Sequence, residues 1–401
     1  MQKEKQLLPR LRFPEFEEVW HTSSLGENCK FNQGVQIPSS EQSSKYCDGF
    51  IRYLYIRDYL DDSFPTYVLN KYPNKIIEEH QIMMVNTGNT AGKAFRGKIG
   101  VLSNNSFKIE WDSTKLNDDY IYLYLTSDFT QNNIKRVFNS GGQPHLGHKN
   151  VAKLPLSFPK LKEQQKIANF LTSIDTQIQT LEKKKSLLEQ YKKGVMQKIF
   201  KQELRFKDED GNAFPEWSKK KLGDLTYKVG KKNKENIQYP IYSINNQEGF
   251  RPQSEQFEGL DSNDRGYDIS LYKIVHKETF AYNPARINVG SIGYSYNLKE
   301  VIISSLYVCF KTNEELEDLY LLAYLDTDRF NKDILRYQEG GVRQYLFYDN
   351  LSQIKIPLPS NKEQNKIANF LSAIDENIAL VNTKIEHTKA YKKGLLQQMF
   401  V

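Results

Sequence analysis

Apolar residues recur every seven positions in two long segments of the chain, 161–200 and 361–400. The first row is Ile167, Ile174, Leu181, Leu188 and Val195, and the second is Ile367, Ile374, Val381 and Leu395, with Thr388 interrupting it. This spacing places the apolar side chains in one stripe along an α-helix, as in the seam of a coiled coil. Charged residues, such as the lysines at 183–185, occupy the other faces. We predict two helices, each roughly 60 Å long, that pack on each other; the alternative is that each packs on its own domain.

Outside these segments, apolar and polar residues alternate in short runs, such as 51–56, 98–102 and 301–310. Runs of this kind, with Gly and Asn between them, predict β-strands joined by turns. One helical stretch follows in each half of the chain, at 118–138 and at 314–337. The sequence therefore predicts an α+β fold with two mixed domains and two helical spacers. The predicted boundaries are 1–158 and 204–358 for the domains, and 159–203 and 359–401 for the spacers.

The two helical segments are copies of one another at an offset of 200 residues. Lys162-Glu163-Gln164 recurs as Lys362-Glu363-Gln364, and Tyr191-Lys192-Lys193-Gly194 recurs as Tyr391-Lys392-Lys393-Gly394. An ungapped alignment of 161–200 with 361–400 has 19 identities in 40 positions. Looser landmarks extend the repeat, since Leu11-Arg12-Phe13 and Trp20 correspond to Leu204-Arg205-Phe206 and Trp217. Because 27–140 and 224–339 show little similarity, we predict a pseudo-twofold repeat in which antiparallel helices hold two dissimilar domains at opposite ends.

The composition is that of a globular protein, with 39% hydrophobic and 26% charged residues. No apolar run is long enough to span a bilayer, and the segment 1–10 lacks the apolar core of a signal peptide. Cys29, Cys47 and Cys309 form no CxxC pair, which fits unpaired thiols in a reducing compartment. We therefore expect a cytoplasmic protein with no membrane partner. The net charge of +7 permits nucleic-acid binding without requiring it.

Three motifs resemble catalytic or metal sites only superficially. The segment 88–93 has one residue too few between its glycines for a phosphate-binding loop, so we expect a turn near nucleic-acid phosphates or a simple hairpin. Tyr282-Asn283-Pro284 lacks the continuation of a methyltransferase Asn-Pro-Pro-Tyr loop. It predicts either an ordinary turn or a loop that presents its side chains to nucleic acid. His145 and His148 lack the Cys or carboxylate neighbours of a metal site, so we expect no metal there.

The duplicated segment from Lys162-Glu163-Gln164 to Tyr191-Lys192-Lys193-Gly194 resembles the specificity subunit of Type I restriction–modification enzymes. The resemblance covers the whole chain, as domain, helix, domain, helix. It implies a non-catalytic subunit whose two target-recognition domains read the halves of a split, asymmetric sequence in double-stranded DNA. Open alternatives are a DNA methyltransferase or nuclease with an unrecognised site, and a coiled-coil adaptor that reads no DNA.

The same resemblance implies partners and cofactors. The partners would be methyltransferase subunits, expected in two copies, and restriction/translocase subunits that join through the complex. S-adenosylmethionine, ATP and magnesium would be bound by these partners and not by this chain.

Loops in each domain carry side chains suited to DNA, because Arg pairs with guanine, Asn or Gln pairs with adenine, and Lys contacts phosphate. In the first domain, the loops 87–98 and 141–149 contain Asn89, Lys93, Arg96, Lys98, Gln143, His145 and Lys149. In the second domain, the candidates are Lys231, Lys232, Lys234, Tyr282, Asn283, Arg286, Arg343, Gln344 and Tyr345. We expect most contacts from the loop that follows each glycine pair, Gly141-Gly142 and Gly340-Gly341.

Overall fold

The computed structural model describes residues 8–137, 145–246, 249–256, 259–296 and 298–401. The chain forms two compact units, which we call unit 1 (Met1–Glu182 with Asn382–Val401) and unit 2 (Lys183–Val381). Two long helices, α5 (Leu161–Phe200) and α11 (Asn361–Met399), each contribute one part to each unit. These bounds confirm the two predicted helices.

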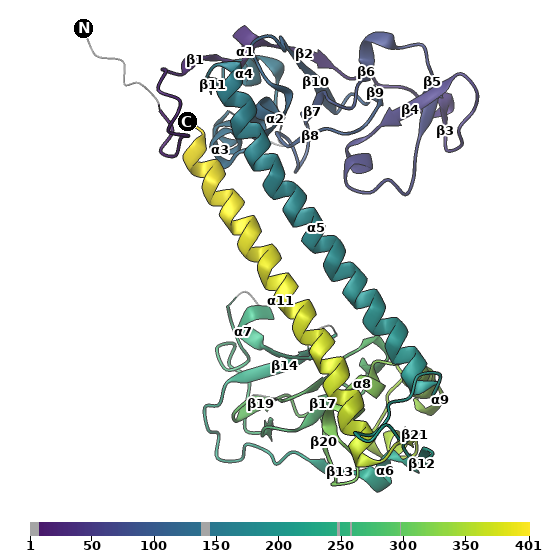
Figure 1. Cartoon of the computed structure of the whole chain (residues 1–401). Helices are drawn as coiled ribbons and strands as arrows, with labels where there is room; N and C mark the ends of the chain where they lie inside the picture. The colour runs from purple at the N-terminus through teal and green to yellow at the C-terminus, as the bar shows by residue number, and fades with distance from the viewer. Residues whose placement is uncertain (1–7, 138–144, 247–248, 257–258, 297) are drawn as a thin grey trace. The chain divides into compact units, whose positions relative to one another are not determined.

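The body of unit 1 contains short strands and helices (Figure 1). Its strands are β1 (His21–Ser24), β2 (Cys29–Gln33), β3 (Gln42–Ser43), β4 (Phe50–Leu54), β5 (Tyr67–Leu69), β6 (Ile76–Ile77), β7 (Ile82–Val85), β8 (Ala94–Phe95), β9 (Gly100–Leu102), β10 (Ser106–Trp111) and β11 (Pro155–Phe158). Its helices are α1 (Leu25–Asn28), α2 (Asp118–Thr126), α3 (Asp128–Arg136) and α4 (His148–Ala152), with 3-10 turns η1 (Ser39–Glu41), η2 (Ile56–Tyr59) and η3 (Pro73–Lys75).

The body of unit 2 has the same kinds of element. Its strands are β12 (Ser218–Lys221), β13 (Thr226–Val229), β14 (Ile241–Asn245), β15 (Gly249–Pro252), β16 (Lys273–Val275), β17 (Phe280–Tyr282), β18 (Ile292–Tyr294), β19 (Val301–Ile303), β20 (Val308–Thr312) and β21 (Lys355–Leu358). Its helices are α6 (Leu222–Leu225), α7 (Gln253–Gln256), α8 (Asp318–Leu325), α9 (Asp328–Tyr337) and α10 (Tyr348–Leu351), with the 3-10 turn η4 (Ile287–Val289).

The two bodies share one topology. A four-stranded antiparallel sheet has the order β2-β10-β7-β8 in unit 1 and β13-β20-β17-β18 in unit 2. A second sheet has a parallel pair at its centre, β4 with β9 and β14 with β19, and each pair is flanked by antiparallel strands. The pairs β1–β11 and β12–β21 also correspond. Apart from β3, which extends the second sheet beyond β5 in unit 1 and has no counterpart among the described strands of unit 2, bodies that differ in sequence therefore have the same frame of strands.

The start of one long helix and the end of the other complete the core of each unit. In unit 1, Phe400 from the end of α11 packs on Tyr120 and Tyr124, with ring centroids 5.4 and 5.8 Å apart. In unit 2, Phe200 from the end of α5 packs in the same way on Tyr320 and Tyr324, with ring centroids 5.5 and 5.4 Å apart. These tyrosines correspond to Tyr120 and Tyr124 at the offset of 200. Within each unit the two helices are therefore antiparallel.

The apolar stripe of the long helices packs against the bodies as well as within the helix pair. Ile167, Ile174, Val195, Ile367, Ile374, Val381 and Leu395 are buried, whereas Leu181 and Leu188 are half-buried. All of the buried ones except Val381 belong to the two large cores that the bodies form with the helix ends. The two long helices also contact each other within each unit, for example through the ion pair of Lys392 with Asp175, so the predicted helix pair is confirmed. Each body packs on part of the stripe as well.

Two other local predictions need correction. The helical stretches at 118–138 and 314–337 are each two helices, because Ser127 and Thr327 have extended backbones and cap α3 and α9 with their side chains. Residue 138 itself lies outside the described residues. The run 301–310 contains parts of two strands, β19 and β20, and not one strand.

Candidate nucleic-acid interface

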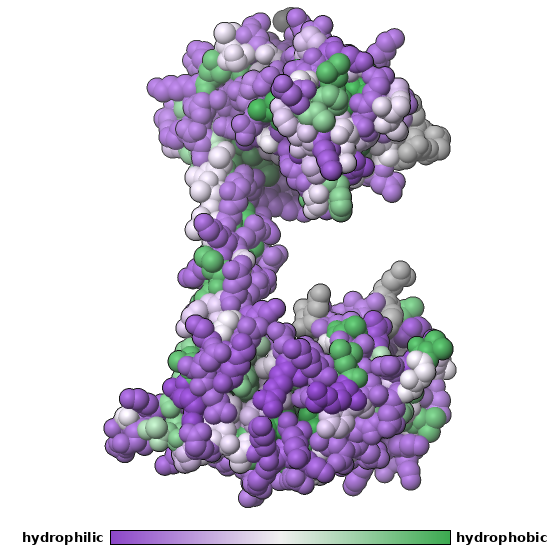
Figure 2. All heavy atoms as spheres, turned by 90° about the vertical axis from the view of Figure 1, so that its right-hand side faces the viewer, coloured by the Kyte–Doolittle hydropathy of each residue, from purple (hydrophilic) through white to green (hydrophobic). Residues whose placement is uncertain are grey.

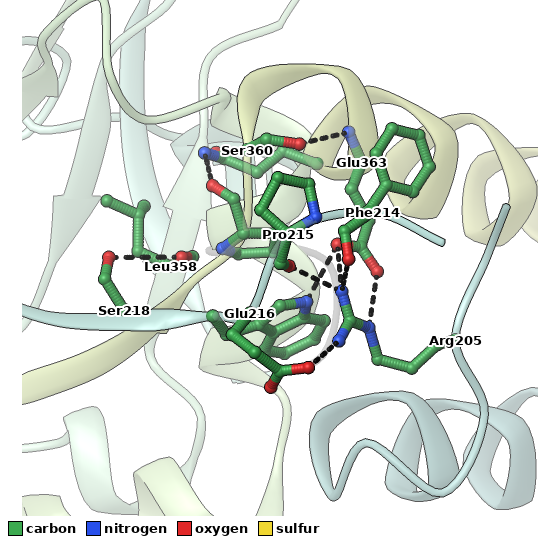
Figure 3. Close-up of polar contacts among 11 residues, drawn as sticks. Arg205, Phe214, Pro215, Glu216, Ser218, Leu358, Ser360 and Glu363 are labelled. Atoms are coloured by element: carbon green, nitrogen blue, oxygen red, sulfur yellow. Dashed lines mark hydrogen bonds and ion pairs between the residues drawn. The ribbon is translucent and has the colours of Figure 1, made fainter. Parts of the chain in front are cut away.

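The repeated landmarks of the sequence meet in one buried cluster, which Figure 3 shows for unit 2. Arg205 donates to both carboxylate oxygens of Glu363, at 3.0 Å each. The Trp217 indole donates to the same carboxylate at 2.9 Å, and Arg205 also donates to the carbonyls of Phe214 and Pro215. Glu363 is fully buried, so these donors compensate for the loss of its hydration.

The corresponding cluster in unit 1 has the same chemistry. Arg12 donates to the two oxygens of Glu163 at 2.7 and 2.8 Å, and Trp20 donates to Glu163 at 3.3 Å. The Leu-Arg-Phe, Trp and Lys-Glu-Gln landmarks therefore fix the entry of each body onto a long helix. Their contacts join each body to its long helix.

The glutamine of each Lys-Glu-Gln motif is also fully buried and satisfied. Gln364 accepts a hydrogen bond from the backbone N–H of Glu317 at 2.9 Å and donates to the carbonyls of Glu315 and Pro359. Gln164 makes the same contacts with Asn117, Lys115 and Pro159. These amides join the first turn of each long helix to the segment that precedes α2 or α8, which orients the four-stranded sheet on the helix.

Each four-stranded sheet has one end from which several loops leave, and we call it the loop end. In unit 1, β2 and β7 finish there, and β8 and β10 begin there. In unit 2, β13 and β17 finish there, and β18 and β20 begin there. Four strands thus deliver their connecting loops to one surface in each unit, so the loop end can present several side chains together.

The glycine-rich segment 88–93 is the hairpin loop between β7 and β8. Gly92 donates to the carbonyl of Val85, and Val85 donates to the carbonyl of Lys93, at 2.8 and 2.9 Å. Gly88 and Gly92 have φ values of +90° and +87°, which favour glycine. The structure therefore has a hairpin here, and it places Asn89 and Lys93 on the exposed loop. Its nearness to nucleic-acid phosphates stays a prediction.

The last loop of the first body meets this hairpin. The N–H of Leu146 donates to the carbonyl of Asn86 at 2.7 Å, and the side chains of Thr87 and His145 share a hydrogen bond of 3.3 Å. His145 and Lys149 are exposed beside it. Gln143 lies outside the described residues.

Unit 2 repeats this junction with different side chains. The N–H of Leu346 donates to the carbonyl of Pro284 at 2.9 Å, which joins the Asn-Pro turn after β17 to the segment 343–346. Arg286 is exposed, and the Asn283 side-chain oxygen accepts the N–H of Ala285 at 3.0 Å. Asn283 would therefore have to release this turn before it could pair with adenine through both of its amide atoms.

Tyr282 is not a surface residue, which corrects its place among the predicted DNA contacts. It is the last residue of β17, its side chain is fully buried, and its ring packs 6.3 Å from that of Phe310. Burial raises the pKa of its hydroxyl far above the usual value. Its ring belongs to the apolar core on one face of the sheet, and this packing keeps the side chain from DNA.

Two predicted cations of unit 1 already have partners within the body. Arg96 forms an ion pair with Asp119 at 2.6 Å and lies over the Tyr122 ring, 4.4 Å from its centroid. Lys98 pairs with Asp62 in the connection between β4 and β5. Contact of either residue with phosphate would have to replace an internal ion pair.

The remaining candidates of unit 2 lie in two places. Lys231, Lys232 and Lys234 are exposed after β13, where the carbonyl of Lys231 accepts the N–H of Ile274 at 2.8 Å. Arg343 and Gln344 are exposed in a hairpin that reciprocal backbone hydrogen bonds between Glu339 and Tyr345 close, at 2.9 and 2.8 Å. DNA contact by these residues stays a prediction.

Sequence reasoning missed a polar network at the loop end of unit 1. The Gln33 side chain donates to the carbonyl of Ser106 at 3.1 Å and accepts from the Asn86 amide at 3.2 Å. Asn104 is exposed next to it. In the sequence these residues stand at the end of a strand or in the turn after one, which identifies a turn but not which turns meet.

The described residues contain neither a group of three or more His, Cys, Asp or Glu side chains able to hold a metal ion nor a helix long and apolar enough to cross a membrane. The face drawn in Figure 2 is mostly hydrophilic, with hydrophobic residues in small, separate patches.

Both halves of the chain match one family model. Residues 17–190 and 215–389 each match the Type I restriction modification DNA specificity domain. The chain belongs to this family. Its function is that of a specificity subunit, which recognises DNA and is not itself the catalytic subunit.

Curated relatives agree with this assignment, and a solved structure shares the fold. The Type I restriction enzyme MjaVIII specificity subunit of Methanocaldococcus jannaschii is 27% identical over 410 aligned positions, covering 96% of this chain and 92% of the relative. The putative MjaX specificity subunit of the same organism is 29% identical, over 70% of this chain and 66% of the relative. The S subunit of a Type-I restriction-modification system from M. genitalium has a TM-score of 0.60 at 16% identity, over 98% of this chain and 99% of that chain. At this identity the likeness shows the fold alone.

Proposed function

We propose that each unit of this specificity subunit reads one half of a split, asymmetric DNA target through the loop end of its four-stranded sheet. The observation that carries the proposal is the pair of equivalent junctions, Leu146 to Asn86 and Leu346 to Pro284. Each junction gathers loops from distant parts of the sequence at the same end of the same sheet. Exposed Lys, Arg, Asn and Gln side chains on these loops have the donors and acceptors that phosphates and base edges require.

The asymmetry of the target follows from the different side chains that the two units carry on corresponding sheets. Asn89, Lys93 and His145 project in unit 1, whereas Arg286, Arg343 and Gln344 project in unit 2. The long connection of the second sheet also falls at a different place in each unit. In unit 1 it is 55–66, between β4 and β5, whereas in unit 2 it is 253–272, between β15 and β16, which correspond to β5 and β6. Different donors at equivalent places select different bases, so the two half-sites differ.

The long helices provide equivalent docking sites for partner subunits. Tyr191 and Tyr391 stand at corresponding positions of the repeat and have 53% and 57% of their surface exposed. Exposed tyrosines are typical anchors of protein interfaces. We infer that two methyltransferase subunits bind, one at each copy of the Tyr-Lys-Lys-Gly segment, and that restriction/translocase subunits join through them. S-adenosylmethionine, ATP and magnesium belong to these partners.

Mapping methylated adenine across the genome, with and without this gene, tests the proposal. We expect a split motif that disappears when the gene is deleted. Exchange of 1–158 for the same segment of a relative should alter one half of that motif and leave the other half unchanged. A motif that persists without the gene, or both halves changing together, would contradict the proposal.

A further inference from the structure

The hairpin 339–345 of unit 2 carries a fully exposed apolar side chain at its tip. Val342 has a relative exposure of 106%, the highest among the large hydrophobic residues that the structure describes as exposed. Isolated apolar side chains on a surface are common, but this one follows two glycines and directly precedes Arg343 and Gln344. It is therefore adjacent in sequence to two exposed side chains suited to reading bases.

The hairpin holds this tip in a defined position. Reciprocal hydrogen bonds between Glu339 and Tyr345 close it, and the Tyr345 ring stacks on Phe347 with centroids 5.6 Å apart and planes at 6°. Gly340 has a φ of +125°, and a Cβ there would lie 2.2 Å from the carbonyl oxygen of Arg343, so the turn requires glycine. A tip on a closed hairpin loses less conformational freedom on binding than one on an open loop.

The hairpin belongs to the surface that the proposed function assigns to DNA. Leu346, directly after the hairpin, is hydrogen-bonded to the turn that precedes Arg286. The major groove admits a two-stranded ribbon, so it has room for a narrow loop closed by a single bridge, such as this one. Arg343 and Gln344 would there face guanine and adenine edges. The one apolar group that base edges present in the major groove is the C5-methyl of thymine.

We propose that Val342 contacts the C5-methyl group of a thymine in the half-site read by unit 2, an inference that rests on the proposed function. Its branched side chain is short, so it suits contact with a methyl group in the groove. Side chains that wedge between base pairs are more often long or rigid, such as Phe, Leu, Ile, Met or Pro. Val342 then selects thymine over cytosine at one position beside the bases read by Arg343 and Gln344.

The test uses the full chain assembled with its methyltransferase subunits and duplexes that carry the mapped motif. Each thymine of the half-site read by unit 2 is replaced in turn by uracil, which removes only the C5-methyl. We expect one replacement to weaken binding by about fourfold, the effect of one buried methyl group. Val342→Ser should bind the thymine and uracil duplexes equally, whereas the matched control Leu335→Ala, an exposed site on α9, should still discriminate between them.

Equal binding of all thymine and uracil duplexes by the unaltered protein would overturn the inference, and so would discrimination retained by Val342→Ser. If the Val342→Ser chain also lost its methyltransferase subunits on purification, the tip would be a protein contact and the inference would be wrong. Failure of the unaltered complex to bind the motif duplex would instead contradict the proposed function, and the inference with it. A further duplex carries 2-aminopurine next to the thymine, because this base fluoresces when it is unstacked. A rise in its fluorescence on binding would mean that Val342 wedges between base pairs, and would overturn the methyl contact.

Discussion

Lys392 donates to both carboxylate oxygens of Asp175, at 2.6 and 2.7 Å, and so ties the end of α11 to α5 within unit 1. Lys192 and Asp375 form the equivalent ion pair in unit 2, at 2.6 Å. Two pairs of residues that recur at an offset of 200 therefore meet across the helices, each within one unit. This contact gives a physical reason for their presence in both copies of the helix.

Reversal of one charge in this pair should weaken unit 1. Lys392→Glu places two carboxylates together, and since both sites are partly exposed we expect a loss of about 1 kcal/mol in the free energy of unfolding. The double variant Lys392→Glu with Asp175→Lys should recover most of that loss in thermal melting. Lys393→Glu is the control, because its side chain is 68% exposed and lies 3.9 Å from its acidic partner. No recovery in the double variant would show that the pair itself does not stabilise the helices.

Loss of the buried carboxylate in unit 2 should cost much more. Glu363→Gln leaves Arg205 without its paired charge in a site that is largely shielded from water, and we expect a loss of about 3 kcal/mol. Glu216→Gln removes the other carboxylate near Arg205, at 3.4 Å, but its side chain is 91% exposed, so we expect a change below about 0.5 kcal/mol. Chemical unfolding of both variants measures the difference, and equal effects would contradict the structural role assigned to Glu363.

Replacement of Tyr282 by Phe should leave DNA binding unchanged. The buried hydroxyl has no hydrogen-bond partner among the described residues, so its removal should not destabilise the protein and is expected to raise the free energy of unfolding by up to about 1 kcal/mol. The measurement is thermal melting together with binding of the motif duplex. A clear drop in affinity would mean that Tyr282 reaches DNA after all, and that β17 opens on binding.

Stability should fall with acid partly because of His148. Burial, aided by the neighbouring His145, lowers the pKa of His148 below its usual value of about 6.5. The unfolded chain then takes up the proton first, so stability from this group is lost as the pH falls from about 6.5 toward the folded-state pKa. The ring stacks on Phe31 and meets Phe107 at an angle of 70°, and its Nε2 has no partner among the described residues.

His148→Phe should therefore reduce the loss of melting temperature between about pH 7.5 and about pH 5.5. His80→Gln, at an exposed histidine of the same unit, should leave that loss unchanged. An identical pH profile for His148→Phe and the unaltered protein would contradict the prediction.

Arg343→Ala should weaken recognition at one base pair. If Arg343 reads guanine, removal of its guanidinium should cost about 1–3 kcal/mol of binding and relax the motif at that position only. Arg336→Ala is the control, since Arg336 is exposed on α9 and pairs with Asp333. The methylated motif and the duplex affinity report both effects, and no change in either would remove Arg343 from the interface.

The sequence by itself determined the two long helices, their offset of 200 residues and the division of the chain into two like halves. These features depend on local periodicity and on identity between copies, both of which can be counted along the chain. The strands at 51–56 and 98–102 were also predictable, because alternation of apolar and polar residues reflects burial of one face.

Only the tertiary structure decided which distant segments meet. It placed Phe400 in the core of the first body and Phe200 in the core of the second. It also showed that two unlike sequences share one order of strands, and that Tyr282 is buried while Arg286, a few residues later, is exposed. The physical reason is that sheet pairing, aromatic packing and hydrogen bonds such as Leu346 to Pro284 join residues far apart in sequence, and no local pattern records such partners.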